Sequence, residues 1–150
     1  MEIVPYAAVN AAIFNKDGKI LITRRDPEIR EGGKWCLPGG HLDGGEDWVT
    51  AIRREILEET GLVVKKEELA GIYSDPKLTV TDSPLRHTGN YAQFLVALFI
   101  VTEWEGEVMR TKEVDSWDWF DLGNLPTPMI KSHPIRVRDS FEFNGKVFVR

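Results

Sequence analysis

The stretch that decides the fold is GGHLDGGEDWVTAIRREILEETGL, residues 39–62, in which glycine-rich turns lead into an acidic segment with helical spacing. We predict a helix over Asp47–Thr60 because apolar side chains recur there at helical intervals. Its expected buried stripe consists of Trp48, Val49, Ala51, Ile52 and Ile56. Gly61 follows directly, where a left-handed glycine commonly ends a helix. The stretch therefore predicts a turn, an amphipathic helix and a sharp stop.

Three carboxylates crowd one side of the C-terminal half of this helix. Glu55 and Glu59 are four residues apart and Glu58 lies beside them, so like charges repel and also oppose the helix dipole. Each effect costs roughly a few tenths of a kcal/mol. A solvated, charged helix face is the ordinary interpretation of such a pattern. The alternative is a cation site, because Mg²⁺ prefers carboxylates, water and substrate phosphates as ligands.

The surrounding residues also suit a cation. The glycines at positions 39, 40, 44 and 45 allow backbone carbonyls or amides to come close to a ligand. Arg54 lies one residue before Glu55 and four before Glu58, so it can hold a carboxylate in place. Glu46 lies at the helix start, where the dipole favours an acid.

The same stretch resembles the Nudix box, G-x5-E-x7-R-E-U-x-E-E-x-G-U, in which U is a bulky aliphatic residue. The matching residues are Gly40, Glu46, Arg54, Glu55, Ile56, Glu58, Glu59, Gly61 and Leu62. The likeness continues through Trp35–Gly40 and Trp119–Leu122, and so covers nearly the whole chain. It implies an α/β fold, the Nudix-type α/β/α sandwich with a mixed β-sheet, with residues 1–150 as a single Nudix hydrolase domain.

The resemblance also implies an activity and its residues. Nudix enzymes hydrolyse a nucleoside diphosphate linked to another moiety, with Mg²⁺ or Mn²⁺. The implied metal ligands are Gly40, through its carbonyl, Glu55, Glu58 and Glu59. Arg54 would orient these carboxylates, and the catalytic base would be Glu58 or Glu113, with Glu58 preferred because Glu113 can equally be a rim charge. This chemistry agrees with the crowded carboxylates, because cleaving P–O–P with water requires neutralised phosphates and an activated water.

Candidate substrate contacts lie outside the box. Arg24 and Arg25 follow a predicted strand and can pair bidentately with phosphate oxygens, although exposed arginines are common there. Trp35 is a candidate for stacking on a base and Gln93 for contacting a base edge; core packing and strand exposure are the ordinary alternatives. The further aromatic candidates are Tyr73, Tyr91, Phe94, Trp117 and Trp119. The polar loop at 75–90 can act as a lid or specificity loop.

Two features favour different substrates. Pro76, 15 residues after Gly61, resembles a marker of ADP-ribose pyrophosphatases. The turn at 39–46 and the segment at 115–119 resemble instead those of Nudix members that act on nucleoside triphosphates. Nucleoside triphosphates are therefore the preferred substrate class, and their hydrolysis would give a monophosphate and pyrophosphate. The alternatives are ADP-ribose or a nucleotide sugar, decapping of RNA 5′ ends and, from another class, a catalytically silent nucleotide-binding regulatory module. The intact glutamate set argues against the last.

The remaining sequence predicts a mixed sheet covered on both faces. We expect Ala7–Phe14 and Lys19–Thr23 to pair as an antiparallel hairpin around Asn15–Gly18. Further strands are predicted at 34–37, 62–64, 69–73, 91–101 and 114–120, with 91–101 central, and a tight turn at 122–126. A second helix is predicted over His133–Phe141, and 141–149 as a final hairpin or a loose tail.

Composition narrows the function classes. The 150 residues are 42% hydrophobic and 29% charged, which suits one globular domain. A net charge of −5 offers no broad basic field for nucleic acid, so a small nucleotide is the expected partner. The single cysteine, Cys36, excludes an internal disulfide. The sequence has neither a signal-like start nor an apolar run of ~20 residues, which predicts a cytoplasmic protein without a membrane partner. A homodimer is a candidate assembly, because relatives in the resembling family often form dimers.

Overall fold

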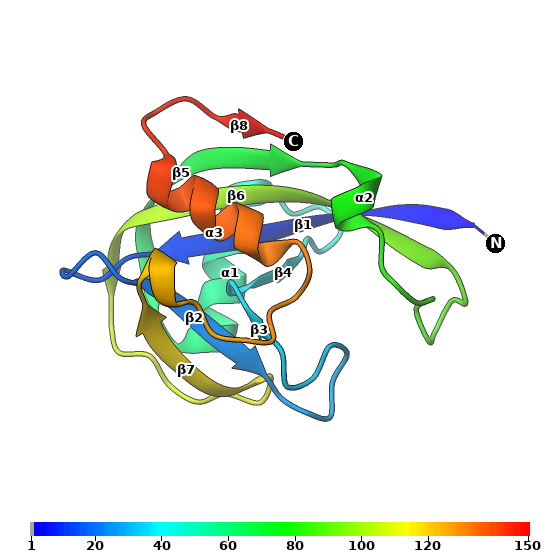
Figure 1. The fold of residues 1–150 in the computed structure, drawn as a ribbon, viewed down its shortest axis with the longest axis horizontal. Coiled ribbons are helices and arrows are strands. Elements are labelled where there is room, and N and C mark those ends of the chain that lie inside the picture. The colour runs from blue at the N-terminus through cyan, green and yellow to red at the C-terminus, as the bar shows by residue number, and fades with distance from the viewer. Residues whose placement is uncertain (1) are drawn as a thin grey trace.

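The structure, a computed structural model that describes residues 2–150, contains two β-sheets with helices packed around them (Figure 1). The larger sheet has the order β4-β1-β6-β5-β8, formed by Gly39–His41, Ile3–Ile13, Tyr91–Glu105, Val63–Tyr73 and Phe148–Val149. The smaller sheet has the order β3-β2-β7, formed by Trp35–Cys36, Ile20–Arg25 and Val114–Phe120. The helices are α1 (Trp48–Thr60), α2 (Pro76–Thr79) and α3 (His133–Glu142), with a 3₁₀ turn at Leu122–Asn124. The larger sheet is mixed, because β1 runs parallel to β6 and β5 runs parallel to β8.

Alternate residues of β1 belong to two separate cores. Val9 and Ile13 pack in the core that contains Ile52 of α1. Ala12 belongs to the second core, together with Val137 of α3. Figure 1 shows α3 in front of the larger sheet and α1 behind it. The predicted α/β sandwich with a mixed sheet is therefore confirmed.

Helix α1 begins and ends where the sequence predicts. Asp47 caps it by accepting a hydrogen bond from the Thr50 N–H at 2.7 Å. Gly61 ends it in the left-handed region, with φ at 81°, and its N–H donates to the Leu57 carbonyl at 3.0 Å. These caps satisfy backbone groups that the helix leaves unpaired.

The buried stripe of α1 is shorter than predicted. Ala51, Ile52 and Ile56 are fully buried, whereas Trp48 and Val49 are each 40% exposed. The prediction is wrong for the first turn because Trp48 borders an open apolar groove on β5 and β6, beside residues such as Ile72 and Leu95. The core packing of α1 therefore starts one turn later than the periodicity indicates.

The predicted hairpin is correct in its turn and wrong in its pairing. The Asn15 side-chain oxygen accepts from the Asp17 and Lys19 N–H groups, both at 3.0 Å, and so forms the turn. Pairing then continues only through an isolated bridge between Phe14 and Ile20. Beyond this bridge β1 joins the larger sheet beside β6 and β2 joins the smaller sheet. Both strands are buried on both faces, so each needs neighbours on two edges that a single hairpin does not supply.

Several other elements differ from the predicted ones. The strand at 34–37 is confirmed as β3, but Gly39–His41, expected as part of a glycine-rich turn, forms β4 against β1. The strands predicted at 62–64 and 69–73 merge into β5, which carries register shifts. The strands at 91–101 and 114–120 and the second helix are confirmed. The loop at 75–90 contains α2. Among residues 2–150 no helix is long and apolar enough to span a membrane.

The segment at 141–149 is neither a hairpin nor a loose tail, because β8 adds to β5 and is held by Arg150. The Arg150 Nε and Nη2 atoms donate to the fully buried Asp139 of α3 at 2.8 and 2.9 Å. The Tyr73 hydroxyl of β5 donates to the same carboxylate at 2.7 Å. Burial would raise the pKa of Asp139, but the hydrogen bonds from Arg150 and Tyr73 bring it below its ordinary value. This clasp, formed by Tyr73, Asp139 and Arg150, fastens α3 to the sheet.

Candidate active site

Strand β4 passes directly beside two carboxylates of α1. The Gly39 N–H donates to Glu59 Oε2 at 2.9 Å. The Glu55 carboxylate lies against Gly40 so closely that a Cβ on Gly40 would be 2.5 Å from its carboxyl carbon. Only glycine leaves room for this contact. The glycines before the helix therefore bring the backbone of β4 and these two carboxylates together.

These carboxylates lie in a poorly solvated environment. Glu59 is only 6% exposed, and burial raises its pKa to about 8, against the lowering effect of the Gly39 N–H. The charges of Glu55 and Glu113 raise it further. Burial likewise raises the pKa of Glu55. This environment disfavours the ionised form of both carboxyl groups, and a divalent cation would relieve that penalty.

Arg54 connects the turn before α1 to the carboxylates on it. Its Nε and Nη2 atoms donate to the two oxygens of Glu46 at 2.7 and 2.9 Å. Its Nη1 donates to Glu55 at 2.9 Å and to Glu58 at 3.2 Å, and Nη2 also donates to the His41 carbonyl at 3.0 Å. The hydrogen bonds from Arg54 lower the pKa of Glu46 to about 2. Arg54 therefore holds three glutamates, Glu46, Glu55 and Glu58, in fixed positions relative to one another.

Both candidate bases lie at the rim of the cluster. The Glu58 side chain is 59% exposed. Glu113 is exposed in the loop before β7, near enough that its charge raises the pKa values of Glu55 and Glu59. Within residues 2–150, no three acidic, histidine or cysteine side chains form a complete metal site by themselves. The oxygen donors nevertheless fit Mg²⁺, which completes its coordination with water and substrate phosphates.

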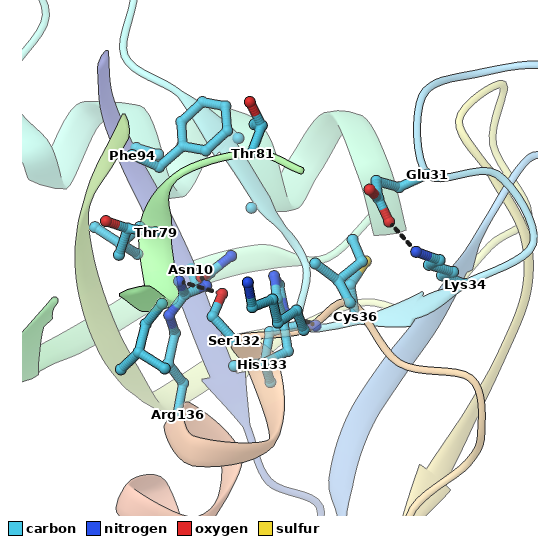
Figure 2. A pocket seen from close by; sticks show the side chains of 18 of the residues that line it. Asn10, Glu31, Lys34, Cys36, Thr79, Thr81, Phe94, Ser132, His133 and Arg136 are labelled. Atoms are coloured by element: carbon cyan, nitrogen blue, oxygen red, sulfur yellow. Dashed lines mark hydrogen bonds and ion pairs between the residues drawn. The ribbon is translucent and has the colours of Figure 1, made fainter. Parts of the chain in front are cut away.

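A pocket of about 140 Å³ adjoins Gly39 and Gly40 (Figure 2). Its polar and charged lining includes Asn10, Arg25, Arg30, Ser132, His133 and Arg136. Figure 2 shows Asn10, Ser132, His133 and Arg136 gathered together, with Phe94 and Thr81 on the opposite side. The acidic cluster and the cationic pocket therefore share β4 as a common wall.

Comparison with known proteins agrees with this geometry. A match to the NUDIX domain family covers residues 4–140. The chain belongs to the Nudix family. It is 36% identical over 122 residues to an ADP-ribose pyrophosphatase of Methanocaldococcus jannaschii, an alignment that covers 81% of this chain and 65% of that protein. It is 33% identical over 154 residues to an RNA pyrophosphohydrolase of Acidiphilium cryptum, covering 93% of this chain and 91% of that protein.

Solved structures support the same assignment. A MutT NUDIX hydrolase from Burkholderia pseudomallei matches with a TM-score of 0.69 and 28% identity, covering 90% of this chain and 97% of that one. A MutT protein from Methanosarcina mazei matches with a TM-score of 0.70 and 26% identity, covering 95% of this chain and 94% of that one. The Nudix fold of this chain is thus shown by both sequence and structure.

The pocket beside Gly39 and Gly40 contains only some of the predicted substrate contacts. Arg25 lines it, and its Nε donates to the Arg30 carbonyl at 2.7 Å. The fork of Arg24 is instead paired with Asp115, at 2.9 and 3.2 Å. In the described part of the chain the structure does not bring Arg24 into this pocket. An arginine one residue along a strand points to the opposite face, which explains the difference.

Trp35 and Gln93 are also engaged elsewhere in the residues that the structure describes. Trp35 packs edge-on against Phe120, with ring centroids 5.5 Å apart. The Gln93 side-chain amide donates to the Ser74 carbonyl at 2.9 Å. Neither side chain belongs to the pocket lining. Trp35 is therefore part of the packing of the smaller sheet, and Gln93 binds the backbone just after β5.

The other aromatic candidates divide between the pocket and the core. Phe94 lines the pocket and stacks on His41, with centroids 5.1 Å apart. Tyr73 is 1% exposed and belongs to the clasp. Trp119 stacks on Trp104. Tyr91 is half-buried and Trp117 is exposed, and neither lines the pocket.

Sequence reasoning missed four residues of the pocket wall. Asn10 offered a signal, because it interrupts the apolar run of Ala7–Phe14 with a polar group. The other three, Ser132, His133 and Arg136, come from the start of α3, which shows no motif that marks them. They reach the pocket only because α3 packs across the larger sheet.

Proposed function

We propose that this Nudix protein is a Mg²⁺-dependent pyrophosphohydrolase that cleaves a nucleoside diphosphate linked to another moiety. The best substrate class is a nucleoside triphosphate, which gives a monophosphate and pyrophosphate. The observation that carries this proposal is the contact of Glu55 and Glu59 with the Gly39–Gly40 backbone at the edge of a cationic pocket. Acidic and cationic surfaces side by side suit a metal-bound polyphosphate with an attached organic group.

The proposed metal ligands are the Gly40 carbonyl, Glu55, Glu58 and Glu59. Mg²⁺, or Mn²⁺ in its place, neutralises phosphate charge and lowers the pKa of a bound water when it occupies such a site. Arg54 holds Glu55 and Glu58 through one nitrogen while its other nitrogens bind Glu46. The carboxylates are thereby positioned before substrate arrives.

Other side chains of this chain handle the proton and the phosphates. Glu58 is the proposed base that accepts a proton from the attacking water, and Glu113 is the alternative. Both are exposed at the rim of the cluster, where water reaches them. Arg25 lines the pocket without a carboxylate partner among the described residues, so it can donate to substrate phosphate oxygens.

Two other substrate classes have specific support. The resemblance to the ADP-ribose pyrophosphatase of Methanocaldococcus jannaschii favours ADP-ribose. The resemblance to the RNA pyrophosphohydrolase of Acidiphilium cryptum favours RNA with a 5′-triphosphate. A net charge of −5 disfavours a long RNA, because phosphate contacts carry most of the affinity for nucleic acid. A small nucleotide therefore remains the preferred partner.

The experiment is a panel of substrates with Mg²⁺, with products separated by ion-exchange chromatography. Nucleoside triphosphates are expected to give monophosphate and pyrophosphate. ADP-ribose would give AMP and ribose 5-phosphate, and triphosphorylated RNA would release pyrophosphate. Release of inorganic phosphate alone, or no turnover with any anhydride, would contradict the proposal. Glu59→Gln serves as the matched inactive control because Gln keeps the side-chain shape but cannot ionise to bind a metal.

A further inference from the structure

One wall of the pocket in Figure 2 is organised by a buried arginine. Arg136 is 3% exposed, and its Nη1 donates to Asn10 Oδ1 while its Nη2 donates to Ser132 Oγ, both at 2.8 Å. A guanidinium has five N–H donors. Within residues 2–150 Arg136 has no carboxylate partner, and its buried Nε has no hydrogen-bond partner at all. The guanidinium also lies over the Tyr73 ring, 5.4 Å from its centroid, so Arg136 is a buried cation with an aromatic contact but no ionic partner among the described residues.

The contacts of Arg136 also fix its neighbours as donors. Asn10 turns its oxygen toward Arg136, so its NH₂ group is directed away from the arginine. Ser132 accepts from Arg136, which leaves the serine hydroxyl hydrogen free to donate. His133 Nδ1 accepts from the Leu37 N–H at 2.9 Å, and burial lowers the pKa of His133, so the neutral ring carries its hydrogen on Nε2. All four lining side chains thus present N–H or O–H groups.

The acids that line the same pocket are already paired. Glu31 accepts from Lys34 at 2.6 Å, and Asp82 accepts from Lys131 at 3.2 Å. Among the described residues, no lining carboxylate is left to accept from the donor wall, defined as Asn10, Ser132, His133 and Arg136, and a ligand with acceptors on one edge would match it.

The rest of the lining indicates the size and shape of that ligand. Apolar side chains, Leu78, Val96, Phe94 and Ile130, form much of the remaining surface. The volume of about 140 Å³ is roughly ten times what one water molecule needs. Apolar surface with one edge of donors suits a flat heterocycle better than a bare phosphate.

We propose that the donor wall selects the base of the nucleotide substrate, binding a keto base and rejecting an amino base. The inference rests on the proposed function, since it requires a nucleotide. Guanine and hypoxanthine present O6 and N7, both acceptors, on one edge, a pattern that arginine and asparagine side chains bind well. Adenine presents an N6 amino donor at the same place, which would leave buried donors of the wall unsatisfied. The same logic favours uracil over cytosine.

The test compares ITP with ATP, because their bases differ only in the 6-keto or 6-amino group and in the N1 hydrogen that accompanies the keto form. We expect kcat/KM to be roughly ten- to a hundredfold higher for ITP. Asn10→Asp replaces the NH₂ donor with an acceptor of the same shape and gives Arg136 a carboxylate partner, so the fold should be retained. In this variant the preference for ITP should shrink at least several-fold. Ser132→Ala, which removes one donor, is the second variant and should weaken the preference by less.

Binding without turnover separates this inference from the proposed function. In the absence of metal, IMP should raise the melting temperature more than AMP, and ribose 5-phosphate should raise it least. Equal kcat/KM for ITP and ATP, or a preference unchanged in both variants, would overturn base selection while leaving the hydrolase intact. No turnover with any anhydride, alongside a larger shift for IMP, would overturn the hydrolase and keep base selection. An equal shift for ribose 5-phosphate and IMP would make the wall a phosphate site and overturn the inference.

Discussion

A single hydrogen atom at Gly40 decides whether Glu55 can lie where it does. Gly40→Ala would place a methyl group 2.5 Å from the Glu55 carboxyl carbon, so the carboxylate must move. Displacing a catalytic group by about 1 Å can cost on the order of 10²-fold, and we expect a loss of that size in kcat. Gly44→Ala is the matched control, because nothing lies within 4 Å of its added methyl group. Equal turnover in the two variants would show that the position of Glu55 is unimportant.

Arg54 and its neighbour Arg53 offer a second paired comparison. Arg54→Lys keeps the charge but loses the fork that holds Glu46, so we expect kcat at saturating Mg²⁺ to fall roughly ten- to a hundredfold while the melting temperature changes little. Arg53 makes a similar fork to Glu67, at 2.8 and 3.1 Å, on the outer surface. Arg53→Lys should leave turnover near that of the wild type. Wild-type turnover in Arg54→Lys would make Arg54 an ordinary surface charge.

The choice of base between Glu58 and Glu113 can be made by kinetics. Loss of a general base lowers kcat by roughly 10²–10⁴-fold, so Glu58→Gln should show a loss in this range. Glu113→Gln should be the milder change, with KM little altered in either variant. A severe Glu113→Gln combined with an active Glu58→Gln would reverse the assignment. The measurement is steady-state turnover at saturating substrate and Mg²⁺.

At the scale of elements, local patterns predict what is decided locally. Both ends of α1 follow from Asp47 and Gly61, because capping depends on neighbours within one turn. The Asn15 turn is likewise local. The partner of β1 is not, since its parallel pairing with β6 joins residues about 88 positions apart, Ile3 opposite Tyr91. The same distinction explains why the crowding of Glu55 and Glu59 on one helix face can be predicted from sequence and the place of Arg136 cannot.

The pocket side chains show the same limit in greater detail. Arg24 and Arg25 look equivalent in sequence, yet Asp115 on β7 pairs with one and leaves the other at the pocket. That outcome depends on how β2 meets β7, which no local pattern contains. Ser132, His133 and Arg136 reach the pocket because α3 crosses the larger sheet, and that placement depends on the whole fold.

At the scale of the whole molecule, the buried carboxylates couple stability to pH. The pKa of Glu59 is raised from 4.5 to about 8, so between these values the folded protein holds a proton that the unfolded chain has released. By linkage, the free energy of unfolding of the metal-free protein should fall as pH rises through this range and level off above it. Glu55 acts in the same direction. Urea unfolding at a series of pH values, with a chelator present, measures this slope.

The controls for this prediction are Glu59→Gln and added Mg²⁺. Glu59→Gln should flatten the slope; His133, whose lowered pKa favours stability at higher pH, is the same in both proteins and cancels in the comparison. Mg²⁺ should raise the melting temperature most at the alkaline end, where the carboxylates are ionised. The double variant Glu58→Gln, Glu59→Gln should lose this rise, and an unchanged rise would place the metal elsewhere.

The clasp of Tyr73, Asp139 and Arg150 has a consequence for local opening motions. Helix α3 carries His133 and Arg136 of the donor wall and is preceded by Ser132 at its N-cap, and its Asp139 is held by a side chain from the segment after β8. Whenever Arg150 detaches, a buried carboxylate loses its cation and α3 loses its tie to the segment after β8, leaving only the Tyr73 hydroxyl on Asp139. Hydrogen exchange of the α3 amides should therefore rise and fall together with that of β8, while α1 and its glutamates stay protected. The wall proposed to recognise a base would then open independently of the carboxylates proposed to support hydrolysis.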